Sequence, residues 1–272
     1  MKKVHIQIQS KKNIGTELLG KFRSVFLGHG IEFRDFREYS NGDDAKYIDW
    51  VASSKEQTLI MRRFQEERDG ILQLIIDESE SLFYENNQLK NQLKNQLVKL
   101  IIQASLYSGM KLTAWQLGEK RRDMVYHKNT RITQKKLLQN YKGVFRSDSQ
   151  LSLKEFVEKK QKRAIYVIIS DSLDIEEKSL KALSQLHDVI YLHISSSFEN
   201  TLKGDGLQSL LGETRYFLDL DNESHKNTYQ TRRIKELGDF KRKLHSYKIR
   251  VGIFETGEDP VREIIKTLDT HF

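Results

Sequence analysis

A pattern of metal-ligand residues follows an apolar segment in the first third of the chain. The run Ile-Leu-Gln-Leu-Ile-Ile (71–76) predicts a buried strand, and Asp-Glu-Ser-Glu-Ser (77–81) follows it directly. Asp77, Ser79 and Ser81 therefore stand at the carboxyl end of a strand, where open α/β sheets bind their ligands. Carboxylate and hydroxyl oxygens suit hard divalent cations, with Mg²⁺ the first choice and Mn²⁺ or Ca²⁺ the alternatives. This segment predicts a cation site.

A second apolar run has the same kind of ending. Residues 164–170 read Ala-Ile-Tyr-Val-Ile-Ile-Ser, and Asp171 comes next. Neighbouring parallel strands with these endings would bring Asp77 and Asp171 to one edge of a sheet, where their mutual repulsion favours a bound divalent cation. Thr130 is a candidate for a further ligand from a loop, although a helix cap explains it equally well. Helix capping is also the alternative for the Asp-Ser-Ser segment taken alone.

The elements that must position these residues alternate along the chain. Strands separated by helices imply right-handed crossovers, so the fold class is α/β with a mainly parallel, Rossmann-type sheet flanked by helices. We expect an N-terminal segment at residues 1–69 and an α/β domain at 70–272. The predicted strands are 71–76, 111–117, 124–127, 164–170, 189–194, 216–220 and 251–254, and the predicted helices are about 82–107, 133–142, 151–160, 175–186, 228–247 and 260–270.

The helix at about 82–107 contains a repeated Asn-Gln-Leu-Lys sequence. The repeat predicts that Leu89, Leu93, Leu97 and Leu100 share one face and pack against the sheet. A coiled coil would need sustained heptads, which the segment lacks.

Composition limits the classes of function. The 272 residues include no cysteine, which excludes disulfides, thiolate metal sites and cysteine nucleophiles. No apolar stretch approaches the ~20 residues that span a bilayer, and the basic N-terminus has no apolar core after it, so we expect a cytoplasmic protein. The formal net charge of +8 would suit nucleic acid, but the basic residues are spread out and are typical of solvated helix faces.

The Asp-x-Ser-x-Ser motif with a later strand ending in Asp resembles the metal-ion-dependent adhesion site (MIDAS) of von Willebrand factor A domains. Upstream, Gly30–Trp50 reads GIEFRDFREYSNGDDAKYIDW, and Arg63–Arg68 reads RFQEER. This resembles the signature of the Domain of Unknown Function 58 family, roughly G-x-E-F-x-D-x-R-x-Y-x-x-G-D-D-x-R-x-I-D-W followed by F-x-E-E and D-x-S-x-S. The resemblance implies a von Willebrand A-like domain with an N-terminal extension. It also implies that a MoxR-type AAA+ ATPase and a client protein are the partners.

The N-terminal signature admits three interpretations. Trp50 and Phe33 could be core residues of a small cluster, with the acids capping turns or pairing with Arg34 and Arg37. The signature could instead form a docking surface for the ATPase or its client. A catalytic metal site for phosphodiester cleavage is the third, although no histidine lies near the acids. The candidate interaction residues are Glu32, Arg37, Tyr39, Gly42, Asp43, Asp44, Asp49 and Trp50.

The predicted cation site has two hydroxyls and few charges, so an ion there would keep waters and an open position. No general base is evident beside it, which favours a binding role over Lewis-acid catalysis. We therefore expect a non-enzymatic, metal-dependent protein-interaction module. A metal-dependent phosphodiester hydrolase and a charge-driven nucleic-acid-binding protein are the alternatives.

Overall fold

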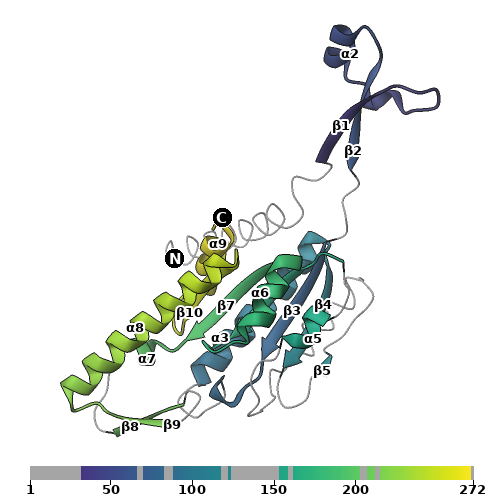
Figure 1. Cartoon of the computed structure of the whole chain (residues 1–272). Helices are drawn as coiled ribbons and strands as arrows, with labels where there is room; N and C mark the ends of the chain where they lie inside the picture. Colours follow the sequence, from purple (N-terminus) through teal and green to yellow (C-terminus); the bar gives the residue numbers. More distant parts are fainter. Residues whose placement is uncertain are drawn as a thin grey trace, which may run out of the picture.

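A six-stranded sheet forms the centre of the protein, and the computed structural model describes residues 32–65, 70–82, 88–117, 122–123, 153–158, 162–202, 207–211 and 215–270. The strands of this sheet are β3 (Ile71–Asp77), β4 (Lys111–Leu117), β5 (Arg122–Asp123), β6 (Ile165–Ser170), β7 (Asp188–Ser195) and β10 (Arg250–Glu255). Their order is β10-β7-β6-β3-β4-β5 (Figure 1). The first five run parallel and β5 is antiparallel at the edge, which confirms the predicted α/β class.

Helices cover both faces of this sheet. They are α3 (Gln88–Ser108), α5 (Lys154–Glu158), α6 (Glu177–Leu186), α7 (Ser197–Thr201), α8 (Glu223–Ser246) and α9 (Pro260–Leu268). Helices α3 and α9 pack on one face, and α5, α6 and α8 pack on the other (Figure 1). Successive strand residues point to opposite faces, so Leu74 and Ile76 join the first core while Ile75 joins the second.

The buried face of α3 differs from the predicted one. Leu93 and Leu97 are buried, but Leu89 is 57% exposed, so its predicted place on that face is wrong. Each step of four residues turns a helix by about 400°, and a stripe with that spacing rotates away from the sheet by about 40° a step. The structure buries Lys90 and Lys94 together with the leucines, at the spacing i, i+3, i+4, i+7.

The remaining predicted elements that the structure describes fall close to the observed ones, with one difference. The strand expected at 124–127 lies outside the described residues, and just before it β5 pairs antiparallel with the end of β4. The strand expected at 216–220 is β9 (Arg215–Asp219), which pairs with β8 (Leu207–Leu211) in a separate two-stranded sheet. The predicted helix at 133–142 lies outside the described residues.

The N-terminal segment contributes a separate hairpin. β1 (Glu32–Glu38) and β2 (Ile60–Gln65) pair in antiparallel fashion, and η1 (Ala45–Tyr47) and α2 (Trp50–Glu56) lie between them in the sequence. We call these four elements the arm, and Figure 1 shows it apart from the six-stranded sheet. No helix in the described parts of the chain is long and apolar enough to cross a membrane.

Candidate metal centre

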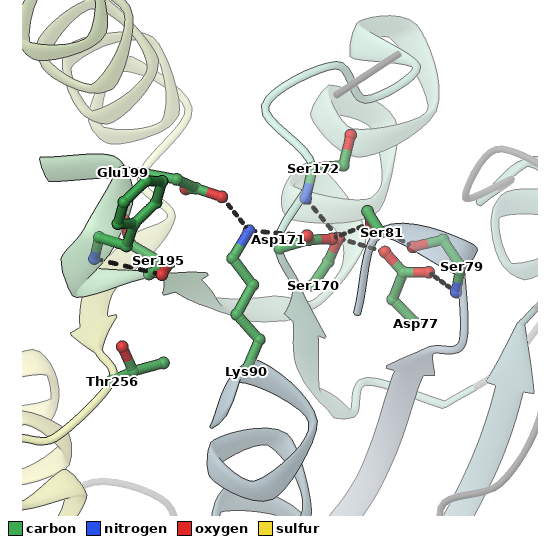
Figure 2. A network of polar contacts seen from close by, with 12 residues as sticks. Asp77, Ser79, Ser81, Lys90, Ser170, Asp171, Ser172, Ser195, Glu199 and Thr256 are labelled. Atoms are coloured by element: carbon green, nitrogen blue, oxygen red, sulfur yellow. Dashed lines mark hydrogen bonds and ion pairs between the residues drawn. The ribbon is translucent and has the colours of Figure 1, made fainter. Parts of the chain in front are cut away.

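The carboxyl ends of β3 and β6 meet at one edge of the sheet. These strands are direct neighbours in parallel register, with Ile76 beside Ile169. Asp77 is the last residue of β3, and Asp171 follows the last residue of β6. After β3 the chain turns into a 3₁₀ segment, η2 (Glu80–Leu82). This turn brings Ser79 and Ser81 back over the strand ends (Figure 2).

Hydrogen bonds join the two acids and the two serines of the predicted site. The Ser79 amide donates to Asp77 Oδ1 at 2.9 Å, and the Ser79 and Ser81 hydroxyl oxygens are 3.0 Å apart. The Ser81 hydroxyl donates to Asp171 Oδ1 at 2.8 Å. The structure therefore brings together Asp77, Ser79, Ser81 and Asp171, while Thr130 lies outside the described residues.

Ser170 is a member of this network that the sequence analysis missed. Its hydroxyl donates to Asp77 Oδ2 at 2.5 Å and also accepts a hydrogen bond from the Ser172 amide at 3.0 Å. Ser170 ends a strand whose inward positions are otherwise apolar, and its hydroxyl is buried. The available signal was a hydroxyl residue directly before the second strand-ending aspartate.

Burial disfavours ionisation of the Asp77 carboxyl group. The residue is 2% exposed, and burial followed by the nearby charge of Asp171 raises its pKa to about 6, against the opposing hydrogen bonds from Ser170 and Ser79. Among the described residues, no basic side chain forms a salt bridge with Asp77. A divalent cation would supply the missing positive charge, and the all-oxygen donor set suits Mg²⁺.

In the part of the chain that the structure describes, two carboxylates of the site, those of Asp77 and Asp171, could bind an ion directly. Within the described ranges, no group of three or more His, Cys, Asp or Glu side chains is placed to hold a metal. An ion held by two aspartates and hydroxyls would complete its shell with water or with a ligand from another molecule. Such an ion would have room in its shell for an oxygen from another molecule.

A buried lysine, Lys90, lies beside the candidate metal ligands, and the sequence analysis missed it. Lys90 Nζ lies 3.3 Å from Asp171 Oδ2 and 2.5 Å from Glu199 Oε1 on α7 (Figure 2). Glu199 Oε2 also accepts a hydrogen bond from Arg233 of α8 at 3.0 Å. Burial alone would lower the pKa of Lys90, but the charges of Asp171 and Glu199 outweigh it and raise the pKa, so the ammonium stays charged.

A second buried lysine, Lys94, lies one turn after Lys90 on α3 and contacts the Asp-x-Ser-x-Ser motif. Lys94 donates a hydrogen bond to Glu78 Oε2, and Gln116 Nε2 donates to Glu78 Oε1 at 3.0 Å. Neither Lys94 nor Glu78 has exposed surface. Glu78 occupies a variable position of the Asp-x-Ser-x-Ser motif, between Asp77 and Ser79. Because Lys94 belongs to α3, this pair connects the loop of residues 77–81, here called the ligand loop, to that helix.

The acids of the arm pair with basic residues and cap helices. Asp43 Oδ1 lies 2.7 Å from Arg37 Nη2, and its other oxygen accepts the Ser40 amide at 2.8 Å. Asp49 caps α2 through the Val51 and Ala52 amides, each at 3.0 Å. Asp49 also lies 2.7 Å from Arg62 Nε, and Asp44 lies 2.7 Å from Lys46 Nζ while it caps η1. Each of the three acids therefore has a basic partner, and Asp44 and Asp49 also cap helices. Of the two expected arginine partners, Arg37 pairs with Asp43, whereas Asp44 and Asp49 pair with Lys46 and Arg62.

The other signature residues have mixed positions. Trp50 is 68% exposed at the first turn of α2, so the expectation that it is a core residue is wrong. Gly42 has a φ of +103°, which favours glycine, in the turn before η1. Tyr39 is half-buried, and Glu32 begins β1, with its side chain outside the described part.

Comparison of the sequence with known protein families identifies the family of this chain. The profile of the family described as "Protein of unknown function DUF58" matches residues 35–236. The chain belongs to this family. The match confirms the resemblance seen in the signature, and the central sheet of this DUF58 protein is mainly parallel, as in α/β folds. No curated protein matches the sequence at a significant level.

Several solved structures are similar to the DUF58 protein at low sequence identity. BatB from Bacteroides thetaiotaomicron is 12% identical, with a TM-score of 0.43, over 73% of this chain and 97% of that one. A von Willebrand factor type A protein from Catenulispora acidiphila is 13% identical, with a TM-score of 0.42, over 75% of this chain and 42% of that one. Proximal thread matrix protein 1 from the mussel byssus, with a zinc-occupied MIDAS motif, is 13% identical, with a TM-score of 0.36, over 47% and 38% of the two chains.

Proposed function

We propose that this DUF58 protein is a non-enzymatic protein-interaction module whose binding depends on a divalent cation, with Mg²⁺ the first choice. Asp77, Asp171 and the hydroxyls of Ser79 and Ser81 would hold the ion. The ion would supply a positive charge with an open position, which an acidic side chain of a partner protein would fill. The observation that carries the proposal is the convergence of two buried carboxylates and two hydroxyls at the carboxyl edge of the sheet.

The balance of charge around the site supports an acidic partner. Among the described residues, four acids and three bases that are buried or half-buried lie around the site, so these seven groups together carry one excess negative charge when all are ionised. A divalent cation converts this excess into one positive charge, and a partner's carboxylate then neutralises it. Buried charge is costly without such compensation. The acids are Asp77, Glu78, Asp171 and Glu199, and the bases are Lys90, Lys94 and Arg233.

The test is metal-dependent binding with the ligand set broken. Asp77→Ala is expected to abolish Mg²⁺ binding measured by calorimetry and to leave the far-UV circular dichroism spectrum unchanged. Asp174→Ala is the matched control, because Asp174 is an exposed acid three residues beyond Asp171. Mg²⁺ binding by Asp77→Ala that equals that of the wild type would contradict the proposal.

We further propose that the partners are a MoxR-type AAA+ ATPase and a client protein, and that the protein binds them in the cytoplasm. The family signature supports this assignment, and the arm provides a suitable surface. Trp50 and Val51 at the start of α2 are 68% and 67% exposed, whereas the acids beside them are fixed by ion pairs. In a pull-down of the ATPase, Trp50→Ala tests the arm, and EDTA with Asp77→Ala tests the metal. Equal recovery of the ATPase under all of these conditions would contradict the assignment.

A further inference from the structure

Lys90 is an internal cation at the edge of the proposed metal site. It projects from the first turn of α3 into the space between Asp171 and Glu199 (Figure 2). Its Nζ lies 3.3 Å from Asp171 Oδ2 and 2.5 Å from Glu199 Oε1, and its side chain is 3% exposed. The ammonium therefore neutralises a proposed metal ligand from inside the protein, almost fully shielded from solvent.

The two partners of Lys90 are not equivalent. The shorter contact is to Glu199, whereas the contact to Asp171 is close to the limit of a hydrogen bond. Asp171 uses its other oxygen to accept the Ser81 hydroxyl at 2.8 Å. An ion bound by Asp171 would face the ammonium across one carboxylate, and two cations so close in a buried site repel strongly. Glu199 offers the ammonium a second anchor once the metal occupies Asp171.

We propose that Lys90 competes with the metal for Asp171 and thereby sets the divalent-cation affinity of the site. This inference rests on the proposed function. When the metal is absent, the ammonium shares Asp171 and Glu199. When the metal is bound, the ammonium retains Glu199 alone. Lys90 keeps metal binding weak until an acidic ligand from a partner offsets the added positive charge, so metal and partner bind cooperatively.

The test is the Mg²⁺ affinity of the full chain, titrated with MgCl₂ alone by isothermal calorimetry. Lys90→Gln removes the charge and keeps groups that can hydrogen-bond to both carboxylates, and Lys90→Met removes the charge with similar length. Both variants are expected to bind Mg²⁺ at least about tenfold more tightly than the wild type, a gain of about 1.4 kcal/mol. If Lys90→Met does not fold, Lys90→Gln still provides the measurement.

Lys99→Met is the matched control. Lys99 is exposed on the same helix, nine residues from Lys90 and thus about 13 Å along the axis, so its loss is expected to leave the affinity within about twofold. Mg²⁺ binding by Lys90→Gln when the wild type binds too weakly to detect would also support the inference. Unchanged or weaker binding by Lys90→Gln beside a wild type that binds Mg²⁺ would overturn it and leave the proposed metal site standing. If neither protein binds Mg²⁺, the metal site itself is wrong and the inference falls with it.

Discussion

The ammonium group of Lys94 on α3 donates a hydrogen bond to the carboxylate of Glu78, and neither side chain has any exposed surface. Glu78 lies between the proposed ligands Asp77 and Ser79. This buried pair therefore ties the ligand loop to the helix behind it. Burial lowers the pKa of Lys94, and the charge of Glu78 opposes that effect.

Removal of Lys94 should destabilise the protein severely. Lys94→Met leaves the Glu78 carboxylate buried without its ammonium partner, while Gln116 still donates a hydrogen bond to it, and such broken pairs cost about 3–5 kcal/mol. Urea unfolding followed by circular dichroism measures the loss. The double variant Glu78→Gln/Lys94→Met removes both charges and should recover at least about half of it. A loss below about 1 kcal/mol for Lys94→Met would show that the pair does not hold the loop.

Asp77→Asn should stabilise the metal-free protein while it abolishes Mg²⁺ binding. Burial and the charge of Asp171 raise the pKa of Asp77 to about 6, above the ordinary value of 3.8. The raised pKa means that ionised Asp77 disfavours the folded state fully above pH 6, and that this penalty fades as the pH falls toward 3.8. At pH 8 the variant should gain up to about 3 kcal/mol in unfolding free energy. The gain should shrink below pH 6, and equal stability of the two proteins at pH 8 without metal would contradict the argument.

The sequence was sufficient to predict the strands that position the site. Long β-branched runs mark strands that are buried on both faces, and their polar endings identified Asp77 and Asp171 at one edge. Parallel neighbours then had to bring these two residues together, as the structure does. The hairpin of the arm was missed because its strands, such as β1 with the sequence Glu-Phe-Arg-Asp-Phe-Arg-Glu, carry too many charges to resemble buried strands.

The buried lysines could not be predicted from the local pattern. Lys90 and Lys94 belong to a polar Asn-Gln-Leu-Lys repeat, and lysine in such a repeat is normally in solvent. Only the tertiary structure places Glu78 and Glu199 within reach of them. The carboxylate partners of the two lysines lie on other segments of the chain. The charge of the site therefore depends on tertiary contacts that the local sequence does not reveal.

His193 should make stability fall in mild acid. The residue has no exposed surface, and burial, followed by the charges of Arg233 and Lys90, holds its pKa well below the ordinary value of 6.5. Below pH 6.5 the unfolded chain binds a proton that the folded state excludes, so stability is lost at up to about 1.4 kcal/mol per pH unit. Urea unfolding at pH 7.5 and 5.5 should show a smaller loss for His193→Leu than for the wild type. Replacement of His225, which is exposed on α8, should leave the loss unchanged. An equal loss in His193→Leu and wild type would assign the effect to other groups.

Gly252→Ala should weaken the contact between β10 and α9. A methyl group at this position would meet the Thr267 hydroxyl below contact distance and would lie 2.7 Å from Phe254 Cε2. Thr267 is 3% exposed and donates to the Glu263 carbonyl at 2.7 Å, so it cannot move aside without breaking that bond. We expect a loss of about 1–3 kcal/mol by urea unfolding. Gly238→Ala is the control: its nearest neighbour is the end of the Arg242 side chain at 3.7 Å, and alanine in α8 should stabilise by up to about 1 kcal/mol. Because the clash depends on the Thr267 side chain, the double variant Gly252→Ala/Thr267→Ala should lose less unfolding free energy than the two single variants lose in total. Strict additivity of the two losses would contradict the proposed contact.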